Sequence, residues 1–230
     1  MHKGDVERYF MSKKTVTLYL IRHGLTQQNL ARQYQGTKLN YDIHDESRDL
    51  ILRRRDRGDM PEVKTLWVSP LVRAKSTATL YFPGMKQHID PDLQERDFGC
   101  WDGYTHEELL ARPDYLEFLD KKGAMTEIEG GESWNSFQDR MERVLLAIED
   151  LVKKAPDQFP LALVFHGGPI FYLSYRLLPE EHPLSLYSCK GAGGLKMKLM
   201  TDPLRAVEAS ELFTDKLDIE LTPFYREFNW

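Results

Sequence analysis

Two histidines in this chain each follow an apolar run directly, and each is followed by glycine. Arg22-His23-Gly24 comes after Thr15–Ile21, and His166-Gly167-Gly168 comes after Leu161–Phe165. A neutral imidazole can act as a base or a nucleophile near neutral pH, and an adjacent glycine lets a ligand approach the backbone closely. Arg22 and Arg73 each offer a planar set of donors that suits bidentate phosphate binding. Together these residue types predict a pocket for a dianion, and phosphate is the obvious candidate.

Phosphoryl transfer to an imidazole requires a neutral, in-line histidine nitrogen, cationic donors for the transferring oxygens and a proton donor for the leaving oxygen. His23, beside Arg22, is the candidate nucleophile. Glu95 is the candidate proton donor, because aromatic neighbours in its loop would partly desolvate it and raise its pKa. Asp97 is the competing carboxyl group, and we prefer Glu95. Asn29 is expected in the first turns of a helix whose N-terminal amides face the anion.

The sequence argues against a catalytic metal and against other nucleophiles. Its seven histidines show neither His-x-x-x-His nor His-Glu-x-x-His spacing, and arginines beside His23 and His166 would repel a divalent cation. Ser69, Cys100 and Cys189 lack the neighbours of an activated nucleophile. Ser69, which precedes a proline, is instead expected to cap a helix. We therefore expect neither a metal nor another cofactor.

Alternating apolar runs and helical patterns would bring the candidate residues together. Short apolar runs predict strands over Thr15–Ile21, Lys64–Ser69, Leu161–Phe165 and Leu195–Met200. Helical spacing of apolar residues and helix-start signals predict helices over Leu71–Phe82, Ser136–Lys154 and Ile170–Leu178. This alternation indicates an α/β fold with a mainly parallel central sheet. In such sheets ligands bind beyond the carboxyl ends of the strands, where His23, Arg73 and His166 are all expected to lie.

Length and composition are those of one large domain. The chain has 230 residues, a net charge of −5 and a pI near 5.8, which does not favour a nucleic-acid-binding surface. No apolar stretch approaches the ~20 residues of a membrane span, and residues 1–14, expected to be a flexible tail, lack the apolar core of a signal peptide. Two cysteines exclude a disulfide framework. We predict a cytoplasmic enzyme or binding protein with one domain over residues 15–230. The basic run 53–57 is expected to be a solvated helix face.

These residues together resemble the motifs of the histidine phosphatase superfamily, the phosphoglycerate mutase-like family. The resemblance covers roughly residues 15–200 and lies in Arg22-His23-Gly24-Leu25-Thr26-Gln27-Gln28-Asn29, Ser69-Pro70-Leu71-Val72-Arg73-Ala74-Lys75-Ser76-Thr77-Ala78, Glu95 and His166-Gly167-Gly168. It implies a three-layer α/β/α sandwich, no metal cofactor and a phosphohistidine intermediate on His23. Arg22, Arg73 and His166 would bind the phosphoryl group. Asn29 would assist them, and Gly24 and Gly167 would complete the binding set. Glu95 would act first as acid and then as base.

Within this family the motifs favour a phosphatase over a mutase. Mutases typically read Arg-His-Gly-Glu-Ser and carry a Leu-Asn-Lys segment after the Glu-Arg pair, whereas this chain has Leu25-Thr26 and Phe98-Gly99-Cys100-Trp101-Asp102-Gly103. The latter segment and Gly130-Gly131-Glu132-Ser133 look like the phosphatase branch, which includes α-ribazole phosphatase and broad-specificity phosphatases. We therefore predict hydrolysis of a small phosphorylated metabolite. A cofactor-dependent phosphoglycerate mutase and a non-catalytic phospholigand-binding relative are the alternatives.

Two segments depart from the family pattern, Thr37–Leu50 and the tail beyond Met200, and a third forms an insertion. Thr37–Leu50 is irregular and acidic where the family has an Asp-x-Pro-Leu-Thr stretch. Residues 102–135 are predicted as a helical insertion over the site, with a helix face at Tyr115, Leu116, Phe118 and Leu119 that packs on the body. In this region we expect four side chains either to line the pocket or to belong to the core: Trp101, Tyr104, Glu132 and Trp134. The tail beyond Met200, which ends in Phe224–Trp230, is expected to be a packing segment or a homodimer contact rather than a pocket lid.

Overall fold

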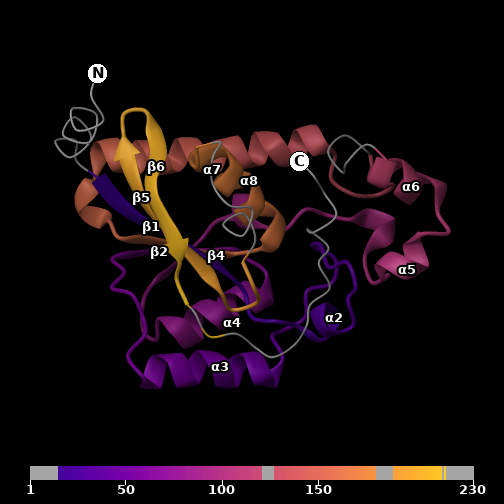
Figure 1. Ribbon diagram of the computed structural model, residues 1–230, viewed down its shortest axis with the longest axis horizontal. Helices are drawn as coiled ribbons and strands as arrows, with labels where there is room; N and C mark the ends of the chain where they lie inside the picture. Colours follow the sequence, from indigo (N-terminus) through magenta and orange to yellow (C-terminus); the bar gives the residue numbers. More distant parts are fainter. Residues whose placement is uncertain (1–14, 121–126, 180–188, 214, 216–230) are drawn as a thin grey trace.

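The computed structural model describes residues 15–120, 127–179, 189–213 and 215. Its centre is a six-stranded sheet with the order β3-β2-β4-β1-β5-β6 (Figure 1). The strands are β1 (Thr15–Arg22), β2 (Thr65–Val68), β3 (Gln87–Ile89), β4 (Leu161–Phe165), β5 (Gly194–Thr201) and β6 (Leu204–Glu211). Strands β1 to β4 run parallel, β5 is antiparallel to β1, and β6 is antiparallel to β5. The predicted α/β fold with a mainly parallel sheet is therefore confirmed.

The four strands expected from the sequence are all present, with ends that shift by one residue at most. The sequence analysis missed β3 and β6. β3 has only three residues and no buried position, and the edge strand β6 buries only Ala206. Short or edge strands of this kind carry no apolar alternation by which a sequence pattern could reveal them.

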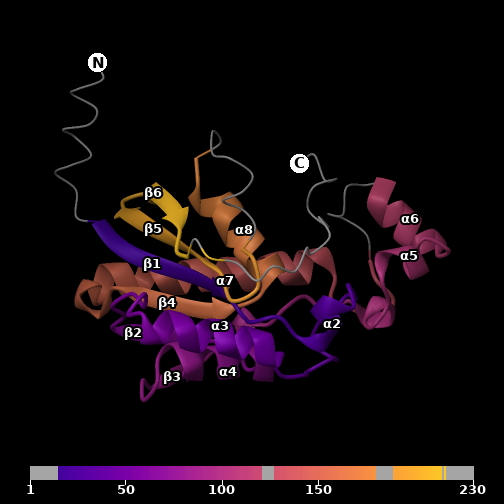
Figure 2. The ribbon, with the colours of Figure 1, turned by 60° about the horizontal axis from the view of Figure 1, so that its bottom comes forward.

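Helices cover both faces of the sheet, which gives the predicted three layers (Figures 1 and 2). One face carries α3 (Asp45–Asp56) and α4 (Val72–Tyr81), and the other carries α7 (Trp134–Lys154) and α8 (Gly167–Leu177). Successive side chains of a strand point to opposite faces. In β1, Leu18 and Leu20 accordingly join the core beneath α7 and α8, whereas Tyr19 and Ile21 join the core beneath α3 and α4. β4 is buried at all five positions, as a strand covered on both faces should be.

The other helices are short and lie away from the sheet or in its connections. They are α2 (Gln27–Leu30), α5 (His106–Leu109), α6 (Pro113–Asp120) and 3-10 turns at Pro91–Leu93, Gly99–Trp101 and Pro156–Gln158. Both ribbon views place α5 and α6 at the same end of the molecule as α2 (Figures 1 and 2). Within the described ranges, no helix is long and apolar enough to span a membrane.

Helices α5 and α6 have a small apolar core of their own. Tyr115 and Phe118 of α6 pack edge-on against Trp101, with ring centres 5.1 and 5.0 Å apart, and Tyr34 joins them from the loop after α2. Leu116, which we expected on the packed face, is 48% exposed. The buried face of α6 therefore closes over this aromatic cluster instead of the main body.

The expectation of a solvated face is wrong for Arg54, which is fully buried in α3. Its guanidinium donates to the Tyr81 hydroxyl, the Ala192 carbonyl, and both the carboxylate and the carbonyl of Asp215. It also lies 4.3 Å from the ring centre of Phe213. The chain after β6 is thus tied to α3 as far as Asp215, which is a packing role. Phe224–Trp230 lies outside the described residues.

We expect Arg54→Met to lower the free energy of unfolding by about 2–4 kcal/mol, because it leaves a carboxylate and buried carbonyl groups without their donor. Urea denaturation measures this change. Arg53→Met is the matched control, since Arg53 is exposed on the same helix, and it should change the value by no more than about 0.5 kcal/mol. Equal effects of the two substitutions would contradict the role given to Arg54.

Candidate active site

His23 directly follows β1, and neighbouring strands hold its backbone. Its N–H donates to the Phe165 carbonyl at the end of β4, and its own carbonyl accepts from the Ala192 N–H, both at 2.9 Å. Nδ1 lies 2.7 Å from the Gly24 carbonyl oxygen. A carbonyl can only accept, so Nδ1 carries the ring proton. The lone pair of the neutral ring is therefore on Nε2, the nitrogen that can act as nucleophile.

Close packing requires glycine next to this histidine. A Cβ on Gly24 would lie 2.9 Å from Cβ of Ser47 and 3.2 Å from Cγ2 of Ile43. The Gly24 N–H donates to Oγ1 of Thr77, and the next amide donates to Oγ of Ser47. Two buried hydroxyls, one from α3 and one from α4, therefore fix the loop that carries His23, and the sequence analysis identified neither.

His166 directly follows β4 and is fully buried. Arg73 Nε lies 3.3 Å from His166 Nδ1, and since a guanidinium has no acceptor, Nδ1 is the accepting atom. Nε2 then carries the proton and donates to Oγ of Ser69 at 2.8 Å. The expectation that Ser69 caps a helix is wrong: α4 begins at Val72 without a side-chain cap, and the buried Ser69 hydroxyl orients the His166 ring instead.

The two imidazole rings lie side by side in an environment that keeps them neutral. Their centres are 5.0 Å apart, and their planes are tilted by 56°. Burial, followed by the positive charges of Arg73 and Arg22, holds the pKa of His23 well below its ordinary value of 6.5. Burial and the same arginines also hold the pKa of His166 well below that value. Both rings are therefore neutral near pH 7, which is the form that a nucleophile requires.

Arg73 and Arg22 supply the positive charge of the site. Arg73 is fully buried in the first turn of α4, and burial lowers its pKa to about 10. Besides His166, its guanidinium donates to the carbonyls at positions 35, 36 and 39. Arg22 donates from Nη1 to the Cys189 carbonyl at 2.9 Å. In the described part of the chain its buried Nε has no hydrogen-bond partner, which makes it a donor for an anion.

Glu95 is 8% exposed and lies in the loop between the turns at Pro91–Leu93 and Gly99–Trp101. Its carboxylate accepts from the N–H groups of Arg96 at 2.9 Å and Gly168 at 3.1 Å. Burial raises the pKa of Glu95, and these two hydrogen bonds and the nearby arginines only partly oppose the rise. A Cβ on Gly168 would lie 2.5 Å from Oε1 of Glu95. Glycine at this position therefore makes room for the carboxylate.

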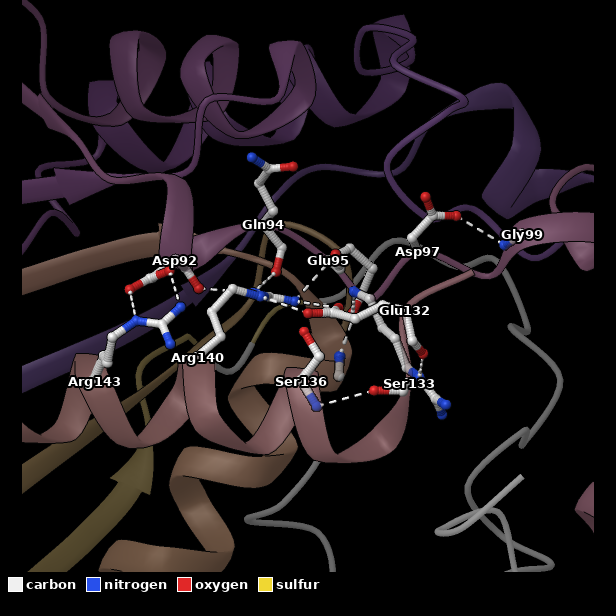
Figure 3. A network of polar contacts seen from close by, with 12 residues as sticks. Asp92, Gln94, Glu95, Asp97, Gly99, Glu132, Ser133, Ser136, Arg140 and Arg143 are labelled. Atoms are coloured by element: carbon white, nitrogen blue, oxygen red, sulfur yellow. Dashed lines mark hydrogen bonds and ion pairs between the residues drawn. The ribbon is translucent and has the colours of Figure 1, made fainter. Parts of the chain in front are cut away.

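Asp97, the competing carboxyl group, is engaged by its own loop. Its Oδ1 accepts from the Gly99 N–H at 2.8 Å (Figure 3). The same oxygen lies 3.7 Å from Nζ of Lys38. The Asp97 carbonyl accepts from the Glu132 N–H. This geometry favours Glu95 over Asp97 as the proton donor.

The remaining candidates take more distant or structural positions. Oδ1 of Asn29 accepts from the N–H and hydroxyl of Thr26. As expected, Asn29 lies in the first turn of a helix, because it is the third residue of the four-residue α2, which Thr26 caps. Among the described residues, no contact joins Asn29 to either histidine. Gly167 is the buried first residue of α8 and precedes the amide that binds Glu95.

The four residues proposed as pocket liners or core have different environments. Trp101 is fully buried in the aromatic cluster of α6, whereas Tyr104 is 50% exposed. Trp134 packs partly buried against the core beneath α7 and α8. Glu132 forms an ion pair with Arg140 at 2.7 Å. The sequence analysis missed Arg140, although it occupies the otherwise apolar buried face of α7. An arginine at such a position is the signal that could have found it.

Over the described ranges, no three His, Cys, Asp or Glu side chains lie close enough together to hold a metal ion.

Both the sequence and the fold of this chain are similar to those of known proteins. Residues 18–190 match the family model of the histidine phosphatase superfamily (branch 1). A glucosyl-3-phosphoglycerate phosphatase from Mycolicibacterium vanbaalenii is 30% identical over 70% of this chain and 73% of its own length. An adenosylcobalamin/alpha-ribazole phosphatase from Salmonella typhimurium is 32% identical over 70% of this chain and 79% of its own length. The crystal structure of a phosphoglycerate mutase from Thermus thermophilus superposes with a TM-score of 0.64 and 28% identity, covering 86% of this chain and 99% of that one.

The chain therefore belongs to the histidine phosphatase superfamily. It is a phosphoric monoester hydrolase, like the two phosphatases to which it is similar.

The lowered pKa values predict how stability depends on pH. Both histidines have a lower pKa in the folded chain than in the unfolded chain, so the unfolded chain binds more protons below pH 6.5. As the pH decreases below that value, the free energy of unfolding should fall by up to about 1.4 kcal/mol per pH unit for each ring. His166→Gln should make this slope shallower, whereas His88→Gln, at an exposed position, should retain it.

Urea denaturation between about pH 7 and about pH 5.5 tests this prediction by comparing His166→Gln with the wild type, since the opposite contribution of Glu95 is present in both proteins. Glu95 has a raised folded pKa, so its protonation stabilises the folded chain as the pH falls. An unchanged slope in His166→Gln would show that this ring is not held neutral by the fold.

Proposed function

We propose that this protein hydrolyses a small-molecule phosphate monoester through a phosphohistidine intermediate on His23, without a metal ion. The observation that carries the proposal is the convergence of a neutral imidazole, two arginines and a raised-pKa carboxyl group at one edge of the sheet. These are the nucleophile, the charge-stabilising donors and the proton donor that phosphoryl transfer requires.

In the first step, the lone pair on Nε2 of His23 attacks phosphorus, and the bond from phosphorus to the ester oxygen breaks. Glu95 gives its proton to the departing oxygen, for which its raised pKa is suited. The Nδ1–H of His23 stays bonded to the Gly24 carbonyl and so stabilises the positive charge that develops on the ring. Arg22, Arg73 and His166 surround the transferring oxygens.

In the second step, the Glu95 carboxylate takes a proton from water, and the water oxygen attacks phosphorus. The phosphorus–nitrogen bond then breaks, so that inorganic phosphate leaves and the neutral imidazole and protonated Glu95 are restored. Glu95 thus acts in both directions, as acid and as base. The nearby Gly168 amide and the Arg96 amide hold its carboxylate between the two steps.

The substrate that we propose is a small phosphorylated metabolite of the cytoplasm. Two similar proteins are named as phosphatases of glucosyl-3-phosphoglycerate and of an α-ribazole compound, and both names denote phosphorylated small molecules. A structural neighbour is named as a phosphoglycerate mutase, so mutase activity is the second candidate. The segment that ends at Gly103 lacks the Leu-Asn-Lys sequence of mutases, which supports phosphatase activity.

His23→Asn should reduce phosphate release by about a thousandfold or more, because it removes the attacking nitrogen. The assay uses a panel of phosphate esters, each with and without a chelator, and wild-type activity should survive chelation. A radiolabelled substrate should label the wild type with an acid-labile, alkali-stable phosphate that His23→Asn lacks. His88→Asn, exposed on β3, is the matched control and should behave like the wild type.

Full metal-independent hydrolysis by His23→Asn would refute the phosphohistidine mechanism. Interconversion of phosphoglycerates that depends on added bisphosphate, with slow phosphate release, would establish the mutase instead. Saturable vanadate binding without turnover of any ester in the panel would show a binding protein.

A further inference from the structure

Arg140 is a buried arginine in the second turn of α7 whose donors are directed at the backbone around Glu95 (Figure 3). Its Nη1 donates to the carbonyls of Asp92 and Gln94, each at 2.7 Å. Its Nη2 reaches the Glu95 carbonyl at 3.5 Å. One side chain of α7 therefore binds three carbonyl oxygens of the segment that ends at Glu95.

Glu132 compensates the charge of Arg140 and binds the same segment from its other side. Its carboxylate accepts from Nε of Arg140 at 3.0 Å and from Nη2 at 2.7 Å, which is a bidentate pair. Its backbone N–H donates to the Asp97 carbonyl at 2.9 Å, and its carbonyl accepts from Nε of Arg96 at 3.1 Å. The ion pair thus contacts the chain both before and after Glu95.

The loop that carries Glu95 depends on these contacts, because residues 94–98 belong to no helix or strand. In the part of the chain that the structure describes, the Glu95 carboxylate accepts its two hydrogen bonds from backbone amides. The direction of the carboxylate is therefore set by where the backbone lies, and Arg140 and Glu132 bind that backbone.

We propose that Arg140, paired with Glu132, is a positioning residue that holds Glu95 in place to protonate the leaving oxygen. The inference rests on the proposed function, since it assigns the placement of that reaction's proton donor. Among the described residues, Arg140 donates hydrogen bonds only to backbone groups of this segment and to Glu132, and its guanidinium lies over the Phe137 ring. Its positive charge also helps to lower the pKa of His166. Arg140→Lys retains that charge, so this substitution tests the placement of Glu95.

This role has a consequence that a general loss of stability does not share. An alkyl phosphate must expel a strongly basic oxygen and needs the proton from Glu95, whereas nitrophenyl phosphate expels a weakly basic oxygen and does not. A displaced Glu95 should therefore slow the first reaction far more than the second. The ratio kcat/KM is the suitable measure, because it reports the transfer to His23 and excludes the later attack by water.

Glycerol phosphate and nitrophenyl phosphate serve as the alkyl and aryl probes. In Arg140→Lys, kcat/KM for glycerol phosphate should fall by about tenfold to a hundredfold, and for nitrophenyl phosphate by less than about threefold. Glu132→Gln should show the same pattern more weakly. Glu95→Gln provides the reference pattern for a missing proton donor. Arg143→Met is the matched control, because Arg143 lies on the same helix and, among the described residues, its hydrogen bonds go to the Asp92 carboxylate and not to the backbone around Glu95.

Thermal unfolding of each variant accompanies the kinetics, so that a folding defect is recognised. A selective loss on glycerol phosphate in Arg140→Lys, with wild-type behaviour in Arg143→Met, supports the positioning role. An equal loss on both esters, or no loss on either, refutes that role while the phosphohistidine mechanism stands. Failure of the wild type to turn over either ester or to become labelled on His23 refutes the proposed function and this inference with it.

Discussion

The positive charge of Arg73 is the physical constraint on which the site depends. A guanidinium taken out of water is costly unless its donors are satisfied, and the polar groups that Arg73 contacts are all uncharged: one imidazole and three carbonyl oxygens. Its charge therefore acts on the rest of the pocket. Burial is the larger cause that keeps His23 and His166 unprotonated, and the charge of Arg73 adds to it. The same charge opposes the rise in the pKa of Glu95, and it favours an anion at the site. It therefore helps to keep the proposed nucleophile neutral and would attract a phosphoryl group.

The sheet builds the surroundings of Arg73 by bringing segments that are distant in sequence to one edge. β4 lies between β1 and β2, so the residues after three neighbouring parallel strands are brought close together: His23, His166 and Ser69. Nε2 of His166 then donates to Ser69, and Nδ1 of the same ring accepts from Arg73. Glu95, the proposed proton donor, lies instead on a loop without regular structure that α7 and the start of α8 hold. The groups of the proposed reaction are therefore positioned by different means, the histidines by strand pairing and Glu95 by hydrogen bonds to the backbone of its loop.

Much of this could be predicted, and the polar residues that were misjudged or missed share a cause. Buried strands such as β4 and the long amphipathic helix α7 show their periodicity in the sequence, and histidines after strands mark the site edge. Arg54, Ser69 and Arg140 were misjudged or missed because each is a polar side chain buried by partners far away in sequence. Arg54 meets Asp215, and Ser69 meets His166. Periodicity reports which face of an element is apolar, but it does not report which distant partner makes burial of a polar group tolerable. The segment after β6 was hard to place for the same reason.

The place of β1 in the sheet also bears on how the molecule is made. β1 is the first described strand of the chain, yet it lies inside the sheet between β4 and β5. Leu18 pairs with Leu161 on one side and with Met197 on the other, so its two partners are synthesised 143 and 179 residues later. During translation both edges of an apolar strand therefore stay unpaired until β4 and β5 emerge, and unpaired edges of this kind invite aggregation. The proposed nucleophile at its end can acquire its surroundings only after both strands have been synthesised, so a nascent chain carries His23 long before it carries the site.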